Sequence, residues 1–207
     1  MKILKETISN LGHKIQLFGN DNYKPILVVG VFHGDEPQGE FLINEYLKEN
    51  SNSSILFIPC LNPDGKFLNQ RQNSNGVDLN RNFPTKNWEI VEDKTFFGGY
   101  ESASEIETKF MIEVIEQVKP KFILTLHAPF CTVNFDGDAL EQAKIISEII
   151  NYPVQDDIGY PTPGSFGTYC GVERNIPTIT LELDENIDVK RLIKPVHKIF
   201  DYLNSML

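Results

Sequence analysis

The chain has 207 residues, of which 41% are hydrophobic and 23% are charged, with no low-complexity stretch. This length and composition are typical of one globular domain with a sizeable core, and they exclude a disordered or fibrous chain. Aspartate and glutamate outnumber lysine and arginine by 29 to 19, and the formal net charge of −10 disfavours binding to a nucleic-acid backbone.

The first residues, MKILKETISNLGHK, contain no apolar core of signal-peptide length, and no later run approaches the length of a membrane span. The cysteines Cys60, Cys131 and Cys170 are scattered and odd in number, and no CxxC pair occurs. They suit a reducing compartment, and we expect buried, inert thiols rather than disulfides or metal ligands. We therefore expect a cytoplasmic protein without membrane or nucleic-acid partners; the sequence does not indicate its oligomeric state.

The predicted elements follow one another in a regular order. Residues 3–8 and 14–18 are expected to form a hairpin that turns at 10–12. Later apolar runs rich in β-branched residues suit strands buried on both faces: residues 26–32, 55–58, 122–126 and 177–183. Segments with helical spacing of apolar residues lie between and after these runs: residues 37–49, 105–118, 138–150 and 188–205.

Local signals mark several of the helix boundaries. Pro37 suits the first turn of its helix. Ser104 and Glu107 predict a capping box for the second helix, and Pro120 is expected to end it. Pro195 is expected to kink or split the last helix.

Strands that alternate with helices predict an α/β fold, in which residues 1–207 form a single-domain α/β/α sandwich. The opening hairpin makes the central sheet mixed and mostly parallel rather than purely parallel. Residues 62–100 fit no periodic pattern and are rich in Asn, Gly, Pro and Asp. Because this segment is too long for an idle connection, we expect it to be a functional loop.

Side chains that can bind a metal follow three predicted strands. His33 and Glu36 come just after the strand at 26–32, and His127 directly follows the strand at 122–126. Glu182 lies near the end of the strand at 177–183. Ligands gather beyond the carboxyl ends of the strands in such sheets, so these side chains can converge. Two histidines and one glutamate are a standard catalytic zinc set that leaves a coordination position for water.

Spacing alone also allows a simpler interpretation, in which His127 is a satisfied, half-buried histidine and Glu182 is an edge carboxylate. Because the burial of an unpaired carboxylate is costly, we expect Glu182 to face a cation or a water-filled cleft. Zinc lowers the pKa of a bound water toward neutrality, and a nearby carboxylate can then accept the proton.

Longer strings favour the metal site. HGDE at 33–36, NPDG at 62–65 and GVDLNRNFP at 76–84 occur in this order, and they are followed by LH at 126–127 and by the strand that ends in Glu182. Together these strings resemble the zinc carboxypeptidase family, which includes carboxypeptidase A, over residues 26–184. NRNFP is a specific signal, whereas HxxE alone is not. The resemblance implies a zinc carboxypeptidase-like fold and a hydrolase that holds one Zn²⁺ per chain.

The family's catalytic roles fall on four residues of this sequence. His33, Glu36 and His127 match the zinc ligands. Glu182 matches the general base, which activates the attacking water and then protonates the leaving amine. A non-catalytic binding module with the same fold would have lost one of these residues, and all four are present.

The resemblance also assigns the residues that bind substrate. Asn80 and Arg81 match the pair that grips a terminal carboxylate, which a guanidinium binds in a bidentate fork. Arg71 matches the arginine that polarises the scissile carbonyl and steadies the oxyanion, with a surface arginine as the alternative. Asp78 resembles a carboxylate that orients the first histidine ligand. Tyr160 resembles the mobile tyrosine that closes over the substrate, with a packing tyrosine as the alternative.

Within the family, the segment GYPTPGSFGTYCG at 159–171 resembles the murein peptide amidase A group. Those bacterial enzymes cut the bond between γ-D-glutamate and meso-diaminopimelate in cell-wall peptides during recycling. The expected partner is therefore a small peptide with a free carboxylate, which Asn80 and Arg81 would hold. Phe166 and Thr168 are candidate wall residues of the pocket.

A general metallocarboxypeptidase and an N-acyl amino acid deacylase on the same fold are the alternatives, and NRNFP favours the peptidase branch. His13 and His197 match nothing in the pattern and are expected to be ordinary surface or helix residues. Asp156 and Asp157 are expected to lie in a solvated turn.

Overall fold

The computed structural model describes residues 1–20, 25–156 and 159–207, and the first of these ranges forms the predicted hairpin. β1 (Lys2–Ile8) and β2 (Lys14–Gly19) pair antiparallel at one edge of the central sheet. Gly12 has a φ of +91° at the turn, a conformation that glycine adopts without a steric penalty. The hairpin was therefore predicted correctly.

Four parallel strands form the centre of the sheet where the apolar runs predicted them. These are β3 (Ile26–Gly30), β4 (Leu56–Ile58), β5 (Phe122–His127) and β8 (Thr178–Glu182). β3 pairs with β4 and β5, and β5 pairs with β8, in each case parallel. Their carboxyl ends therefore meet at the same edge of the sheet.

Two further strands were not predicted. β6 (Thr132–Asp136) runs antiparallel to β8, and β7 (Val154–Gln155) runs parallel to β6. Both are short, and alternate positions of β6 are polar, so neither produces a long apolar run. Among the described residues the sheet has eight strands in the order β1-β2-β4-β3-β5-β8-β6-β7, which confirms a mixed sheet.

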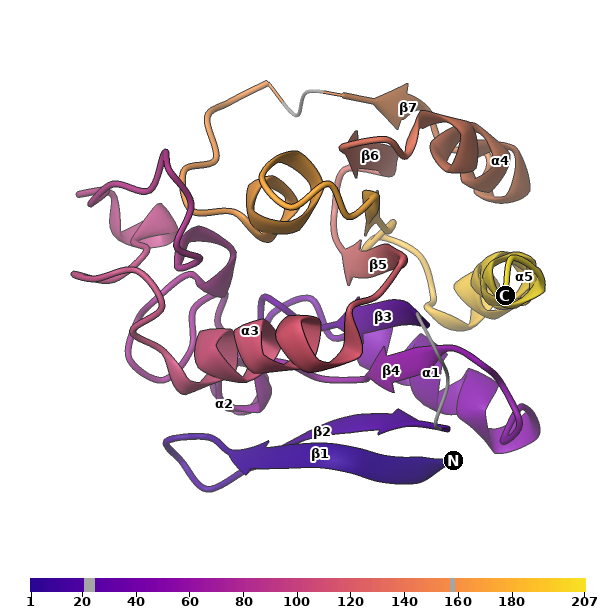
Figure 1. Ribbon diagram of the computed structural model, residues 1–207, viewed down its shortest axis with the longest axis horizontal. Coiled ribbons are helices and arrows are strands. Elements are labelled where there is room, and N and C mark those ends of the chain that lie inside the picture. The colour runs from indigo at the N-terminus through magenta and orange to yellow at the C-terminus, as the bar shows by residue number, and fades with distance from the viewer. Residues whose placement is uncertain (21–24, 157–158) are drawn as a thin grey trace.

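Helices cover both faces of the sheet, as Figure 1 shows. One face packs against α1 (Gln38–Glu49), α4 (Leu140–Ile150) and α5 (Lys190–Ser205), and the other packs against α3 (Ile106–Val118). Side chains alternate along the strands, so that Leu124 and Leu126 enter the first core and Ile123 enters the second. The predicted α/β/α sandwich is confirmed.

Two expectations about the helices need correction. α5 is not split at Pro195, and apolar side chains on both sides of the proline, Leu192 and Val196 among them, are buried in the same core. α3 has Glu105 at its N-cap, without a capping hydrogen bond from the side chain. Ser104 instead donates to Glu105 Oε1 at 2.6 Å, and it accepts from Asn82.

The segment 62–100 contains short helical turns and runs beside the carboxyl edge of the central strands. They are α2 (Pro63–Leu68), η1 (Leu79–Arg81) and η2 (Lys94–Phe96). Asn62 caps α2 by accepting a hydrogen bond from Gly65 N at 2.9 Å. A fourth short turn, η3 (Thr168–Val172), precedes β8.

The cysteines are free, as expected, but they are not all buried. Cys60 and Cys170 are buried, and burial raises the pKa of the Cys60 thiol to about 12. Cys131 is partly exposed, which corrects the expectation of three buried thiols. Among the residues that the structure describes, no helix combines the length and the apolar character needed to cross a bilayer.

Candidate metal centre and active site

The turn after β3 directs His33 and Glu36 toward the carboxyl edge of the sheet. Val31 has a φ of +55°, a left-handed conformation that is strained for a β-branched residue. Two backbone hydrogen bonds hold the turn. Asn62 N donates to Val31 O at 2.9 Å, and Leu61 N donates to Gly30 O at 3.1 Å. Local strain of this kind is concentrated at functional sites.

The neighbouring strands place His127 and Glu182 side by side. They are the last residues of β5 and β8, and they are paired across the parallel ladder. The His127 ring stacks on Phe32, with a centroid distance of 5.2 Å. Both polar side chains are nearly buried, with exposures of 4% and 7%.

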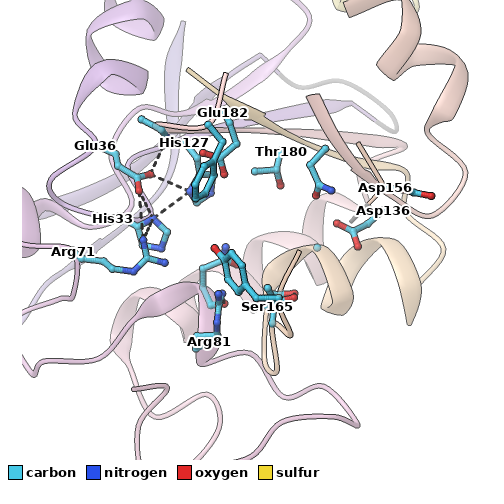
Figure 2. A pocket seen from close by; sticks show the side chains of 17 residues that line it. His33, Glu36, Arg71, Arg81, His127, Asp136, Asp156, Ser165, Thr180 and Glu182 are labelled. Atoms are coloured by element: carbon cyan, nitrogen blue, oxygen red, sulfur yellow. Dashed lines mark hydrogen bonds and ion pairs between the residues drawn. The ribbon is translucent and has the colours of Figure 1, made fainter. Parts of the chain in front are cut away.

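Three potential ligands converge on one point, as Figure 2 shows. His33 Nδ1 lies 2.8 Å from Glu36 Oε1 and 3.3 Å from His127 Nδ1. Glu36 Oε2 lies 3.2 Å from His127 Nδ1 and accepts a hydrogen bond from Ala128 N at 3.2 Å. One ligand atom from each of His33, Glu36 and His127 lies within 4.8 Å of the others.

This donor set fits a zinc ion. The second ring nitrogen of His33, Nε2, lies 3.2 Å from Asp78 Oδ1, and donation to that carboxylate leaves a lone pair on Nδ1. That lone pair faces a carboxylate oxygen and another imidazole nitrogen, an arrangement of acceptors that a cation completes. Nitrogen ligands at about 2.0–2.1 Å from a tetrahedral zinc are roughly 3.3 Å apart, and the two Nδ1 atoms are separated by 3.3 Å.

Asp78 links the histidine ligand to an arginine. Its carboxylate is fully buried and accepts from Arg71 Nε at 3.0 Å and from Arg71 Nη2 at 2.9 Å. Burial would raise the pKa of Asp78, but His33 and Arg71 hold it well below its usual range. Burial alone would lower the pKa of His33, yet Glu36 and Asp78 raise it to about 9. Asp78 therefore lies where the sequence placed a carboxylate that orients His33.

Glu182 points into the pocket without a complete set of partners. Its Oε2 atom is buried and accepts no hydrogen bond from any residue that the structure describes. Burial raises the pKa of this carboxyl, an effect that His127 only partly offsets. A carboxylate in this state is suited to exchange protons with a bound molecule.

A second group of predicted residues lines the same pocket. Asn80 Oδ1 accepts from Phe166 N at 2.9 Å, and this contact leaves the amide nitrogen available to a ligand. Arg81 donates to Asn80 O at 2.7 Å. Its guanidinium lies 5.5 Å from the ring centre of Phe96 and 6.0 Å from that of Tyr160. Tyr160 is 36% exposed at the rim.

Sequence reasoning missed one wall of the pocket. The additional lining residues are Ala128, Phe130, Asn134, Asp136, Asp156, Thr162, Ser165, Gly167 and Thr180. β6 pairs with β8 so that Asn134 lies opposite Thr180, which is two positions before Glu182 and faces the same way. The alternation of polar residues at 132, 134 and 136 was the available signal.

Several minor expectations need correction or limitation. Phe166 does not line the pocket but packs against Phe32 and Phe83, and Thr168 is also absent from the lining. Asp156 is exposed in a bend, as expected, and it also lines the pocket, whereas Asp157 lies outside the described residues. His197 belongs to α5, as expected of a helix residue.

The zinc carboxypeptidase family model matches residues 15–138, more than half of the chain. The chain belongs to the zinc carboxypeptidase family. Three of the residues that converge in the pocket, His33, Glu36 and His127, lie within this match. Glu182 lies beyond it, at the end of the strand that pairs with β5.

Relatives within the zinc carboxypeptidase family include murein peptide amidase A from two bacteria. The Vibrio campbellii protein is 40% identical over 138 residues, which are 61% of this chain and 55% of the relative. The Escherichia coli K12 protein is 32% identical over 170 residues, which are 75% of this chain and 69% of the relative. The matched part of this chain thus spans about half of the first relative's length.

Solved structures agree on the fold. The crystal structure of murein-tripeptide amidase MpaA from Escherichia coli O157 is similar with a TM-score of 0.84 and 28% identity, over 95% of this chain and 89% of that chain. Thrombin activatable fibrinolysis inhibitor has a TM-score of 0.73 at 14% identity, over 99% of this chain and 73% of that chain. The second likeness concerns the fold alone.

Proposed function

We propose that this chain is a zinc-dependent amidase that hydrolyses the bond between γ-D-glutamate and meso-diaminopimelate in murein peptides. The observation that carries the proposal is that one pocket combines the convergent set His33, Glu36 and His127 with a partly unpartnered carboxylate, Glu182. Two relatives named murein peptide amidase A support the choice of substrate.

His33, Glu36 and His127 would hold one zinc ion, through two imidazole nitrogens and a carboxylate. Zinc held by these residues would supply Lewis-acid chemistry, which polarises a carbonyl and lowers the pKa of water. Glu182 accepts a proton from the attacking water as the oxygen adds to the scissile carbonyl carbon. The same carboxyl then delivers the proton to the amide nitrogen as the C–N bond breaks, which releases a carboxylate and a free amine.

The arginines would orient the substrate. Arg81 and the Asn80 amide bind the terminal carboxylate of diaminopimelate, since a guanidinium beside an amide donor suits a carboxylate. Arg71 is held by Asp78 with its Nη1 atom 3.3 Å from His33 Nδ1, so it can donate to the carbonyl oxygen as negative charge develops there. Tyr160, beside Arg81 at the rim, closes over the carboxylate.

A cytoplasmic site of action is part of the proposal. Cys60, Cys131 and Cys170 carry no disulfide, which suits a reducing compartment. Peptides taken up from the cell wall would reach the enzyme there as small, soluble substrates.

The test is incubation of the zinc-loaded protein with L-Ala-γ-D-Glu-meso-diaminopimelate, with mass spectrometry of released diaminopimelate. A chelated sample and Glu182→Gln are the controls. Release that disappears in both controls is the expected result. A protein with stoichiometric zinc that releases no diaminopimelate contradicts the proposed substrate, and release of ordinary C-terminal residues or of acyl groups would then identify a general carboxypeptidase or a deacylase.

A further inference from the structure

Phe96 is the aromatic residue of η2, and its ring lies beside both of the arginines to which the proposed mechanism gives separate roles. The guanidinium carbons of Arg71 and Arg81 are each 5.5 Å from the centre of this ring. Both distances are within the ~6 Å at which the face of an aromatic ring attracts a cation. Phe96 is partly buried, and it does not itself line the pocket that contains the arginines.

The two guanidinium groups repel each other, and Arg81 has fewer strong partners to hold it in place. Burial and the nearby Arg71 lower the pKa of Arg81, an effect that Asp78 and Tyr160 only partly offset. Arg71 is held by Asp78, to which its Nε and Nη2 atoms donate at 3.0 and 2.9 Å. Arg81 instead donates to a backbone carbonyl, that of Asn80, at 2.7 Å. The attraction of an aromatic face therefore matters most for Arg81.

Backbone hydrogen bonds fix Phe96 against the loop that carries both arginines. Gln72, the residue after Arg71, donates from its Nε2 atom to two carbonyls of η2 at 3.1 and 2.9 Å. The backbone N–H of Asp78 donates to Phe97 O at 2.8 Å. The chain on both sides of the phenylalanine is therefore tied to this loop, which gives the ring a fixed place relative to the guanidinium groups.

Tyr160 is the other aromatic residue beside Arg81, and it is less suited to hold the arginine. Its ring centre lies 6.0 Å from the guanidinium carbon of Arg81 and 5.9 Å from the ring centre of Phe96. It is 36% exposed at the rim, and the proposed mechanism requires it to close over the substrate. Phe96 is thus the aromatic partner that stays in place when Tyr160 moves.

We propose that Phe96 is a positioning residue, whose ring holds Arg81 at the distance from Arg71 at which one substrate reaches both. This inference rests on the proposed function, in which Arg81 binds the terminal carboxylate and Arg71 polarises the scissile carbonyl. Figure 2 shows Arg71 beside His33 and Arg81 farther from the metal ligands, so the two arginines reach different parts of the substrate. Because Asp78 also holds Arg71, loss of the ring acts on carboxylate binding, and therefore on KM rather than on kcat.

The first measurement is steady-state kinetics of the zinc-loaded protein on L-Ala-γ-D-Glu-meso-diaminopimelate. Phe96→Leu keeps an apolar side chain but has no aromatic face, so KM should rise by roughly 5- to 30-fold. Its kcat should stay within about threefold of the wild-type value. Phe96→Tyr keeps the aromatic face and should keep both constants. The matched control is Phe97→Leu, a change in the next residue, whose ring contacts Tyr100 at a centroid distance of 5.0 Å.

The pattern of these constants separates positioning from a general structural role. A KM that rises in Phe96→Leu but not in Phe96→Tyr or Phe97→Leu supports the inference. A fall in kcat without a change in KM overturns it, and so does an equal rise of KM in Phe96→Tyr.

A double-mutant cycle identifies the arginine through which the ring acts. If Phe96 acts through Arg81, adding Phe96→Leu to Arg81→Ala should lower kcat/KM by less than about threefold beyond the single variant. Effects that multiply show that the ring acts independently of Arg81, and they overturn the inference.

A measurement of side-chain order does not depend on turnover. NMR relaxation of the Arg81 Nε–Hε group, assigned with Arg81→Lys, gives its order parameter in the zinc-loaded protein without substrate. This order parameter should fall in Phe96→Leu and be kept in Phe96→Tyr and Phe97→Leu. That result supports the inference even if wild-type protein releases no diaminopimelate, in which case only the proposed function fails. An unchanged order parameter in Phe96→Leu overturns the inference. Zinc content and thermal unfolding of each variant establish that it is folded.

Discussion

Two clusters in the described part of the chain combine histidine with a buried carboxylate, and they differ in one respect. In the anchor cluster, formed by Ser9, His13, Asp64 and Ser74, the Asp64 carboxylate is fully buried and fully satisfied. It accepts from His13 Nδ1 at 2.7 Å, from Leu11 N at 3.0 Å and from both serine hydroxyls. In the site cluster, formed by His33, Glu36, His127 and Glu182, ligand atoms of the first three converge, and Glu182 Oε2 has no hydrogen-bond partner among the described residues.

The comparison separates a structural cluster from a functional one. Each donor and acceptor around Asp64 has an intramolecular partner, so this cluster joins the amino-terminal hairpin to the segment 62–74 and requires no ligand. The site cluster has convergent ligand atoms and an unpartnered carboxylate oxygen, a set that could hold a metal ion. Residue type alone does not distinguish the two, since both combine histidine with buried carboxylates.

Removal of a metal ligand is expected to have the largest effect. His33→Ala should lose stoichiometric zinc and reduce activity to background, because the remaining acceptors no longer form a site with three protein ligands. Added zinc should raise the Tm of the chelated wild-type protein but not that of the variant. Metal analysis, peptide hydrolysis and thermal unfolding measure these outcomes. Stoichiometric zinc with full activity in His33→Ala would show that the metal assignment is wrong.

Glu182→Gln tests the unpartnered carboxylate of the same cluster. We expect zinc to stay bound, since Glu182 is not one of the three ligands, while kcat falls by about 10²–10⁴-fold through loss of proton transfer. Metal analysis and steady-state kinetics on the tripeptide measure both quantities. A variant with near-normal kcat would remove Glu182 from the role of base.

Asp64→Asn tests the anchor cluster and should leave zinc content and kcat unchanged. It should lower the free energy of unfolding by about 2–4 kcal/mol, because an amide nitrogen would face groups that now donate to a carboxylate. Denaturant unfolding with parallel kinetics makes the measurement. Loss of zinc without loss of stability would contradict the division between the two clusters.

The pH dependence of stability sharpens this test. Burial would raise the pKa of Asp64, but hydrogen bonds from Ser9, His13, Leu11 and Ser74 lower it below its usual value. A folded pKa below the unfolded pKa means that the stabilisation is present above pH ~4 and is lost as the pH falls through the folded pKa. Asp64→Asn should therefore show a weaker acid dependence than the wild-type protein.

Much of the fold follows from local pattern in the sequence. Continuous apolar runs predicted β3, β4, β5 and β8, and helical spacing predicted α1, α3, α4 and α5, because burial on one or both faces leaves a periodic signature. β6 and β7 have no long apolar run, since both are short and β6 alternates polar and apolar residues. At the start of α3, Glu105 bonds to residues from distant parts of the chain, because its backbone N donates to Asn82 Oδ1 and its side chain accepts from Asn73 Nδ2.

The candidate site was predictable only in part. Strings such as HGDE and NRNFP located the ligands and the carboxylate-binding pair, because their spacing is tied to strand ends and turns. Asp136 was missed because its surroundings are set by contacts with Gly167 across the fold. The alternation of polar residues at 132, 134 and 136 was the one local signal for this wall of the pocket.

The pairing of His127 with Glu182 has a consequence for insertions and deletions. Residues in the loop before β8 can be added or removed while the strand keeps its alignment with β5. A single residue inserted within β8 would instead rotate the side chains that follow it to the opposite face, since side chains alternate with a period of two. Leu181, or a neighbour of similar character, would then occupy the position of the carboxylate. Tolerance to length changes should therefore drop abruptly at the boundary between this loop and the strand.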